Sequence, residues 1–137
     1  NKNFDQVVIN PPYYKTGTPS KNQGRNQSLR ITNPLSEWVN EGVKRLKPNG
    51  WITIINTPEN LIEILIALSK GTGDIQIKPL TSSRDKTANR VIIRAKKGSK
   101  GITKLYAPLI THVSEGNIKK FSYETEEILR RGSPLIF

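Results

Sequence analysis

The sequence predicts a mixed α/β fold built on a largely parallel β-sheet. Three observations predict it: short β-branched runs typical of buried strands, amphipathic helical patterns that alternate with them, and proline or glycine residues at the boundaries. The order strand, helix, strand, helix, strand, strand is typical of right-handed crossovers in such a sheet. A chain of 137 residues is long enough for one core and too short for two, so residues 1–137 are interpreted as a single domain.

The first strand is predicted at Phe4–Ile9, which is rich in β-branched residues and is terminated by the prolines of Asn10–Pro12. Lys15–Thr32 contains glycine, proline and basic residues, which predicts an irregular basic loop. Asn33 and Pro34 then predict a helix start, with asparagine as N-cap and proline as the first helical residue. The apolar positions of this helix recur at spacings of three, four and seven: Leu35, Trp38, Val39, Val43 and Leu46.

The first helix is predicted to end at Pro48–Gly50, and Trp51–Asn56 is predicted to be the second strand. Thr57-Pro58 repeats the capping signal for a second helix that ends at Gly71. The buried stripe of this second helix is expected to consist of its regularly spaced apolar residues: Leu61, Ile62, Leu65 and Leu68. Trp38 lies on the apolar face of the first helix and is assigned to the core.

Two more strands, Ile75–Leu80 and Arg90–Ala95, are predicted on either side of a polar loop. In open α/β sheets, ligands bind beyond the carboxyl ends of the strands. Asn10–Tyr14 and Asn56–Pro58 each follow or end a predicted strand. The ligand is therefore expected beyond the carboxyl ends of the first strands, where these two segments lie.

Residues 98–137 are expected to form a basic, irregular C-terminal extension of the domain. Within it, Leu105–His112 is predicted to be a strand, and Ser122 is predicted to cap a last helix that closes at Gly132. His112 lies in an apolar run and is assigned a structural position rather than a catalytic one. The acidic residues of the last helix are assigned to its N-terminal dipole rather than to catalysis: Glu124, Glu126 and Glu127.

The charge of the chain favours a polyanionic partner. Lysine and arginine number 22 against 11 acidic residues, which gives a formal net charge of +11 and an isoelectric point near 10.1. Arg84–Lys104 contains eight basic residues and is expected to contact phosphate groups. The alternatives are a solvated basic face, general solubility, or a coding bias toward lysine, asparagine and isoleucine.

The composition also excludes several classes of site. The chain has no cysteine and one histidine, which excludes disulfides and thiolate-bound zinc and argues against a Cys/His nucleophile. No metal site is expected, and the composition suits the reducing cytoplasm. The longest apolar-rich stretch, Leu61–Leu68, contains Glu63 and is far shorter than a membrane span, so no membrane association is expected.

Asn10-Pro11-Pro12-Tyr13 is the motif that indicates chemistry. Two consecutive prolines fix φ, remove two N–H groups and hold Asn10 in an extended conformation. The carbonyl groups of Asn10 and Pro11, with the Asn10 side chain, then form a stiff acceptor-rich hook at a strand end. Such acceptors suit a ligand that presents an exocyclic amine, and Tyr13 with Tyr14 offers a flat face for stacking on a base. The alternative is an ordinary strand-to-loop stop with an exposed tyrosine.

These residues resemble a known family. Phe4-Asp5 with Asn10-Pro11-Pro12-Tyr13 is similar to the fourth-strand motif of class I S-adenosylmethionine-dependent methyltransferases that modify amino groups. Leu46–Trp51 looks like the Leu-Leu-Lys-Pro-Gly-Gly step into the fifth strand of that fold. Three further segments are similar to the bacterial methyltransferases that make N6-methyladenine beside the anticodon of a valine tRNA: Ala88–Ser99, Leu105–His112 and Tyr123–Leu129.

The resemblance implies a fold and a mechanism. The chain would be the C-terminal half of a Rossmann-like sheet, strands four to seven with their covering helices, and the last strand would be antiparallel. Tyr13 would stack on a target base that has been turned out of its helix. The Asn10 side chain and the Pro11 carbonyl would accept hydrogen bonds from the target amine, with Pro12 stiffening the hook. Asn10 would also border S-adenosylmethionine, the expected methyl donor.

The resemblance also implies that part of the donor site lies elsewhere. The Gly-rich turn and the acidic residue that hold S-adenosylmethionine in this fold precede the fourth strand, where this chain begins, so the chain alone is expected to be inactive. The usual partner of Phe4–Ile9 would be missing as well. That strand is therefore expected at a sheet edge, where it would pair with a second copy of the chain or with another segment.

The substrate expected from the resemblance is an adenine in tRNA. Seven residues are proposed to bind the nucleic acid: Tyr14, Arg25, Arg30, Arg90, Lys96, Lys97 and Lys100. The same motif also marks enzymes that methylate adenine in DNA or a glutamine amide in protein release factors, so these remain alternatives. A further alternative is an inactive remnant that binds nucleic acid without S-adenosylmethionine.

Overall fold

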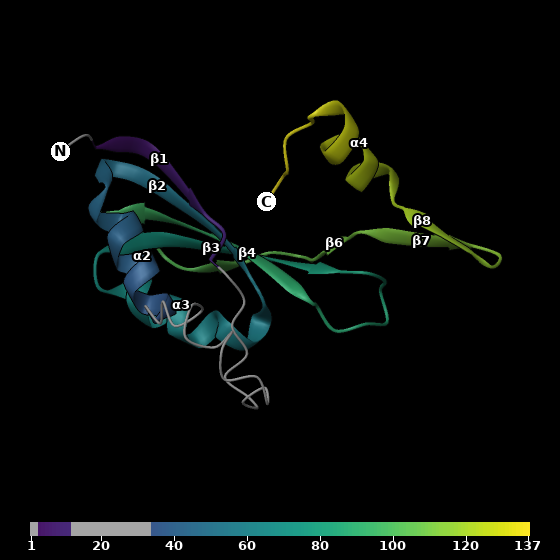
Figure 1. Ribbon diagram of the computed structural model, residues 1–137, viewed down its shortest axis with the longest axis horizontal. Helices are drawn as coiled ribbons and strands as arrows, with labels where there is room; N and C mark the ends of the chain where they lie inside the picture. The colour runs from purple at the N-terminus through teal and green to yellow at the C-terminus, as the bar shows by residue number, and fades with distance from the viewer. Residues whose placement is uncertain (1–2, 12–33) are drawn as a thin grey trace, which may run out of the picture.

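The computed structural model describes residues 3–11 and 34–137. The main sheet and its helices come first in the chain: β1 (Phe4–Ile9), α2 (Leu35–Lys44), β2 (Leu46–Asn56), a 3₁₀ turn (Pro58–Asn60), α3 (Leu61–Ser69), β3 (Thr72–Thr81) and β4 (Arg90–Lys97). Shorter elements follow: β5 (Lys104–Leu105), β6 (Leu109–Ile110), β7 (His112–Glu115), β8 (Ile118–Phe121) and α4 (Tyr123–Arg131) (Figure 1). No described helix is long and apolar enough to cross a bilayer.

The strand order confirms the predicted fold class. The main sheet runs β1-β2-β4-β3-β5, with β6 also paired to β3. β1 and β2 are parallel, whereas β4 is antiparallel to both of its neighbours, β2 and β3. A short polar loop returns the chain from β3 so that β4 inserts beside β2, which is why the last long strand runs opposite to the others. This is the predicted set of four strands with an antiparallel last strand.

β1 lies at the edge of this sheet, as the sequence predicts. Val8 is 72% exposed, and only Val7 and Ile9 of the strand pack against the core. The outer side of β1 pairs with no other described strand. Self-association through this edge stays a prediction, which light scattering on the purified chain would test.

The hydrophobic core lies between the sheet and α2 and α3, which both lie on one face of it (Figure 1). Alternate residues of each strand point into this core because side chains alternate across a strand. In β2 these are Ile52 and Ile54, and in β4 they are Val91 and Ile93. The other face carries Arg94, whose guanidinium group lies 4.9 Å from the Trp51 ring and 5.3 Å from the Phe137 ring. The C-terminal residue is thereby held against that face.

The boundary between α2 and β2 lies earlier in the chain than the sequence predicts. The helix ends at Lys44, and β2 already begins at Leu46, which is opposite Phe4 of β1. Pro48–Gly50 therefore belongs to the strand, and the prediction that it ends the helix is wrong. The N-cap position is Pro34, one residue later than predicted, and Asn33 lies outside the described residues.

The assignment of Trp38 to the core is wrong, since its side chain is 42% exposed. The buried residues of α2 are Val39 and Gly42. A Cβ atom at Gly42 would lie 2.8 Å from the Cδ1 atom of Ile52, so this glycine lets the helix approach the sheet closely. That contact fixes the rotation of α2, and Trp38 then lies to the side of the buried stripe.

The buried side of α3 also differs from the side that the sequence predicts. Its buried residues are Ile64, Ala67 and Leu68, whereas Ile62 is 74% exposed. The predicted burial of Leu68 is confirmed, that of Ile62 is wrong, and Leu61 and Leu65 pack on the core only in part. A helix that is apolar on most sides has no single stripe in its sequence, so packing decides which side is buried.

The predicted strand Leu105–His112 is wrong as one continuous element. It divides into β5, β6 and the first residue of β7. Pro108 interrupts the run and has no N–H to donate to a neighbouring strand. The predicted last helix is confirmed, because the Ser122 side chain accepts a hydrogen bond from the Thr125 N–H and Gly132 ends α4 at φ 69°.

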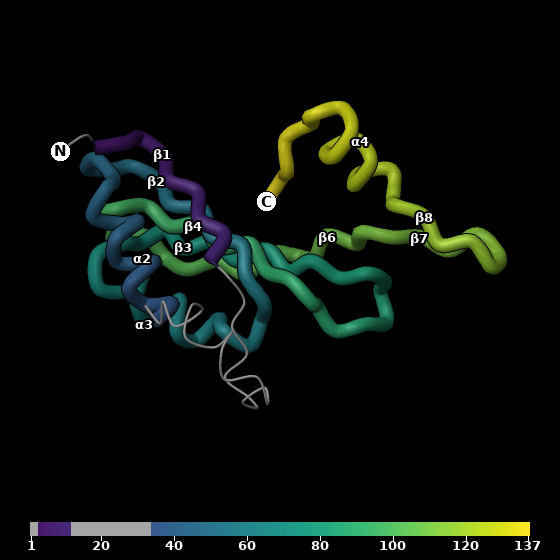
Figure 2. The backbone as a smooth tube through the Cα atoms, viewed as in Figure 1, coloured from purple at the N-terminus to yellow at the C-terminus, as the bar shows by residue number. Residues whose placement is uncertain are grey.

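We call residues 112–131, which comprise β7, β8 and α4, the C-terminal arm. The β7–β8 hairpin extends away from the main sheet, and the chain after α4 turns back toward it (Figure 2). Thr125 is the buried residue of α4. A hydrogen bond from the Ser122 N–H to the Thr111 carbonyl ties the start of α4 to the base of the hairpin.

Candidate active site

The candidate site lies where β1 and β2 end. These strands are parallel and their last paired residues are Ile9 and Ile54, so their carboxyl ends meet at the same edge of the sheet. Asn10 and Pro11 continue the chain beyond β1, and Asn56 ends β2. The predicted ligand edge therefore brings together the described part of the motif and the end of the second strand.

Asn10 and Pro11 have opposite environments. Asn10 is exposed, whereas Pro11 is among the fully buried residues. A buried proline with a fixed φ anchors the peptide that follows the strand, and it leaves the neighbouring asparagine side chain accessible. Five of the other predicted site residues lie outside the described residues: Pro12, Tyr13, Tyr14, Arg25 and Arg30.

Asn56 lies two residues beyond Ile54, the residue paired with Ile9, and is fully buried. Its side-chain Oδ1 accepts hydrogen bonds from the Thr57 N–H at 2.8 Å and from Asn60 Nδ2 at 2.8 Å. Its Nδ2 is buried and has no hydrogen-bond partner in the part of the chain that the structure describes. The sequence places Asn56 at the ligand edge but gives it no role. The sequence feature that could have indicated a role for Asn56 is a polar amide at the end of an otherwise apolar strand.

The predicted phosphate-binding residues of β4 divide between the two faces of the sheet. Lys96 is opposite Trp51 and lies on the same face as Arg94, two residues away, whereas Lys97 lies on the helix-covered face. Arg90 is exposed at the start of the strand, where its Nη1 donates to the Asn89 carbonyl. The sequence alone could not show that the adjacent residues Lys96 and Lys97 make different contacts.

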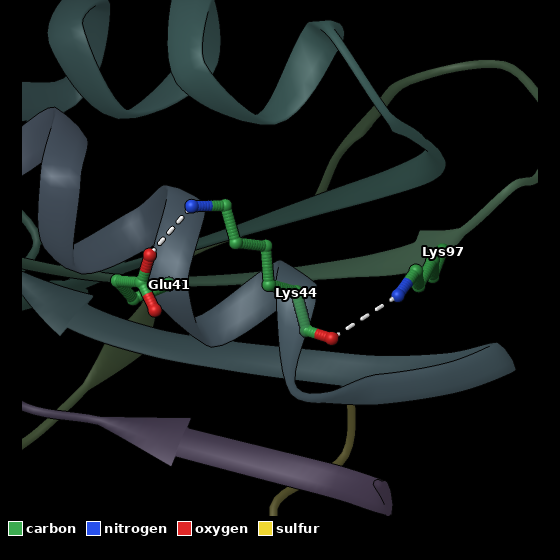
Figure 3. Close-up of polar contacts among 3 residues, drawn as sticks. All are labelled: Glu41, Lys44 and Lys97. Carbon is green, nitrogen blue, oxygen red and sulfur yellow. Dashed lines mark hydrogen bonds and ion pairs between the residues drawn. The ribbon is translucent and has the colours of Figure 1, made fainter. Parts of the chain in front are cut away.

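Lys97 contacts the end of α2 rather than solvent alone. Its Nζ donates to the Leu46 carbonyl, at the start of β2, at 2.7 Å. It also donates to the Lys44 carbonyl at 3.4 Å (Figure 3). Cations stabilise the carbonyl end of a helix because they interact with its unpaired carbonyl groups. On the same helix, Lys44 Nζ lies 2.6 Å from Glu41 Oε1, and this hydrogen bond lowers the pKa of Glu41 below its usual value.

His112 and two of the acidic residues of α4 have structural neighbours. The His112 Nδ1 lies 2.8 Å from the Thr111 hydroxyl, and its ring packs 4.9 Å from the ring of Phe121. Glu126 and Glu127 form ion pairs with Arg130 and Arg131 along α4, at 3.9 Å and 3.2 Å. Among the described residues, no group of three or more acidic or histidine side chains could hold a metal ion.

Comparison with known proteins identifies relatives of this chain. It is 33% identical over 93 residues to the tRNA1(Val) (adenine(37)-N6)-methyltransferase of Shewanella frigidimarina and 32% identical over 90 residues to that of Shewanella sediminis. These alignments cover 66% and 64% of this chain but 37% and 36% of the relatives, so the chain spans little more than a third of their length. No protein-family profile matches the chain.

The structure is similar to that of a predicted O-methyltransferase from Agrobacterium tumefaciens. The TM-score is 0.71 at 22% identity, and the match covers 91% of this chain and 50% of the other. At that identity the similarity establishes the fold. The chain thus has the fold of the methyltransferases, and in sequence it resembles the tRNA1(Val) (adenine(37)-N6)-methyltransferases.

Proposed function

We propose that this chain is the substrate-handling part of an enzyme that transfers a methyl group from S-adenosylmethionine to the exocyclic N6 of an adenine in tRNA. One observation carries the proposal: an exposed Asn10 next to a buried Pro11 at the carboxyl edge of a methyltransferase-type sheet. The relatives named as tRNA adenine-N6 methyltransferases support the choice of substrate.

The acceptor groups of the site suit an amine. The Asn10 side-chain oxygen and the Pro11 carbonyl accept hydrogen bonds from the two N6–H groups of the target adenine. These bonds orient the nitrogen lone pair for in-line attack, and Tyr13 stacks on the base. Bound S-adenosylmethionine would supply the methyl group to the N6 that Asn10 and Pro11 hold, and the N6 proton lost on transfer would pass to water. Positioning and electrostatics supply most of the rate.

S-adenosylmethionine supplies the electrophilic methyl group when it is bound. The described residues fit part of that ligand, because Asn10 is accessible at the edge where donor and acceptor must meet. They contain no Gly-rich turn that leads from a strand into a helix: Gly71 follows α3 and precedes β3. We therefore assign Asn10 to the donor site and no other described residue.

The basic residues near β4 suit the polyanionic substrate. Arg90 and Lys100 are exposed, and Lys96 is half-buried on the face of the sheet opposite α2 and α3. In this proposal they contact tRNA phosphates and contribute affinity that falls with salt. Lys97 contributes less, because its ammonium group already interacts with two backbone carbonyls.

The experiment that tests the proposal measures transfer of radiolabelled methyl groups by the full-length protein that carries this chain. Unmodified tRNA, adenine-containing DNA and a release-factor peptide with a glutamine are offered as separate substrates. The proposal predicts methylation of tRNA at adenine N6, identified by nucleoside analysis. Methylation of only DNA or peptide would replace the substrate class, and no transfer to any of them would refute the activity.

A further inference from the structure

The face of the main sheet opposite α2 and α3 carries cations at neighbouring positions (Figure 1). We call Lys78 of β3 with Arg94 and Lys96 of β4 the cationic row. Gln76 pairs with Arg94 and Lys78 pairs with Ile92, so Lys78 lies diagonally next to Arg94. Lys96 follows Arg94 two residues along the same strand. Paired residues of adjacent strands point to the same side, so the whole row lies on the face opposite the hydrophobic core.

Lys78 is a buried lysine with no acidic partner among the described residues. Its exposed fraction is 9%, and no described residue forms a hydrogen bond or an ion pair with its ammonium group. Lysine is seldom buried to this extent unless it is paired, and such a side chain covers its aliphatic stem and keeps the charged head at the surface. The ammonium group of Lys78 is therefore suited to an anion that comes from outside the chain.

Arg94 is half-buried and contacts aromatic rings. Its guanidinium carbon lies 4.9 Å from the centroid of the Trp51 ring and 5.3 Å from that of the Phe137 ring. In the part of the chain that the structure describes, no residue accepts a hydrogen bond from Arg94. The ring contacts restrict the side chain without using its N–H donors. An arginine held in this way is suited to a bidentate contact with a phosphate group.

The acidic residues of the long strands do not neutralise the cationic row. β1 to β4 contain two of them, and both have other partners. Asp5 lies 2.9 Å from Lys47 Nζ, and Asp74 accepts a hydrogen bond from the Ser99 hydroxyl at 2.6 Å. The charge of this face is thus complementary to a polyanion.

The cationic row leads away from the candidate site. Val91 of β4 pairs with Asn56 at the carboxyl edge of β2, and Lys96 pairs with Trp51, five residues further along β4. At about 3.4 Å per residue, this part of the strand is about 17 Å long. A nucleic-acid strand that leaves the candidate site over this face would pass several phosphate groups along the row.

We propose that the face of the sheet opposite α2 and α3 binds the sugar–phosphate backbone of tRNA, with Lys78 and Arg94 as phosphate-contacting residues beside Lys96. The contacts lie on nucleotides that flank the target adenine, and they position the RNA without reading its sequence. This inference rests on the proposed function for its substrate. It adds to that function the two residues Lys78 and Arg94 and the path of the RNA.

The test measures tRNA binding by the full-length protein that carries this chain, by fluorescence anisotropy at several salt concentrations. Lys78→Met keeps the aliphatic stem and removes the charge, and Arg94→Gln removes the guanidinium group. Each variant should reduce the slope of log K for tRNA against log salt by roughly 0.7–0.9, as expected for one lost phosphate contact. A purely structural role would lower the affinity without changing this slope.

Two further variants serve as matched controls. Lys78→Arg keeps the charge and should keep the parent slope. Lys44→Met removes one positive charge from α2, on the opposite side of the sheet, where Lys44 Nζ lies 2.6 Å from Glu41. Its slope should equal that of the parent. Thermal unfolding shows which variants fold, and Arg94→Gln decides the matter if Lys78→Met does not.

The outcomes separate this inference from the proposed function. Parent slopes in the folded row variants, or an equal reduction in Lys44→Met, would overturn the binding face even if the parent methylates tRNA. If the parent binds tRNA without methylating it, the proposed function fails, and reduced slopes still support the face. Reduced slopes on duplex DNA alone, with the tRNA slopes unchanged, would overturn tRNA as the ligand of this face.

Discussion

The main sheet and the C-terminal arm are stabilised in different ways. The sheet and its two helices enclose a continuous core that contains Ile52, Ile54, Ile64 and Ile93. In the arm, Thr125 is the buried residue of α4, and all four residues of β8 are exposed. Burial of apolar surface therefore stabilises the sheet, whereas a helix cap and ion pairs along its own elements stabilise the arm.

The two regions also differ in charge. Residues 84–104 contain eight basic residues and one acidic residue, whereas residues 112–131 contain four of each. In the arm Lys120 pairs with Glu115, Arg130 with Glu126 and Arg131 with Glu127. The excess positive charge is thus concentrated near β4, and its position favours phosphate contacts by the sheet rather than by the arm.

The largest expected effect follows from Asn10 at the site edge. Asn10→Ala should reduce methyl transfer by roughly 1,000-fold or more, because it removes an acceptor that orients the target amine. The side chain is exposed, so the thermal unfolding midpoint should stay the same. Radiolabelled-methyl assays and thermal unfolding of the same full-length protein measure both. Near-parent turnover would remove Asn10 from the site.

The next effect contrasts the two modes of stabilisation. Ile54→Ala should lower the free energy of unfolding by about 2–5 kcal/mol, because it opens a cavity in a fully buried cluster. Leu129→Ala, in the arm, is the matched control: Leu129 is 64% exposed, and its replacement should change the free energy by less than about 0.5 kcal/mol. Urea unfolding followed by fluorescence measures both. Equal losses of unfolding free energy in the two variants would show that Leu129 packs as part of the hydrophobic core.

A smaller effect is expected at the cap of α4. Ser122→Ala removes the hydrogen bond to the Thr125 N–H and should destabilise the helix by about 1 kcal/mol. Hydrogen exchange followed by mass spectrometry should show faster exchange in α4 and no change in β2 or β4. Faster exchange throughout the sheet would mean that the arm and the sheet unfold together.

The smallest effect concerns the charge difference. Replacing Lys96 and Lys100 together with glutamine should reduce the slope of log K for tRNA against log salt by roughly 1–2, as expected for two lost phosphate contacts. The same change at Lys119 and Lys120 of the arm should leave the slope unaltered, because Lys120 already pairs with Glu115. Fluorescence anisotropy at several salt concentrations measures the slopes. Equal reductions would assign the tRNA surface to both regions.

The kind and order of the main elements follow from local signals in the sequence. Phe4–Ile9 has the β-branched composition of a strand, although none of its residues is buried as that composition predicted. Ser122 and Gly132 are the local signals of a helix start and end. Such signals act within a few residues, so they can be recognised in the sequence without knowledge of the tertiary structure. The carboxyl edge that carries Asn10 also follows from the alternation of strands and helices.

The rotation of these elements and the contacts of their side chains depend instead on packing between distant segments. Trp38 and Ile62 are exposed because Gly42 and Ile64 fix which side of each helix approaches the sheet. Lys96 and Lys97 are neighbours in the sequence, but they lie on opposite faces of β4, and Lys97 donates to carbonyls at the end of α2 and the start of β2. These properties depend on contacts between segments that are distant in the sequence. Sequence patterns report local preferences and do not show those contacts.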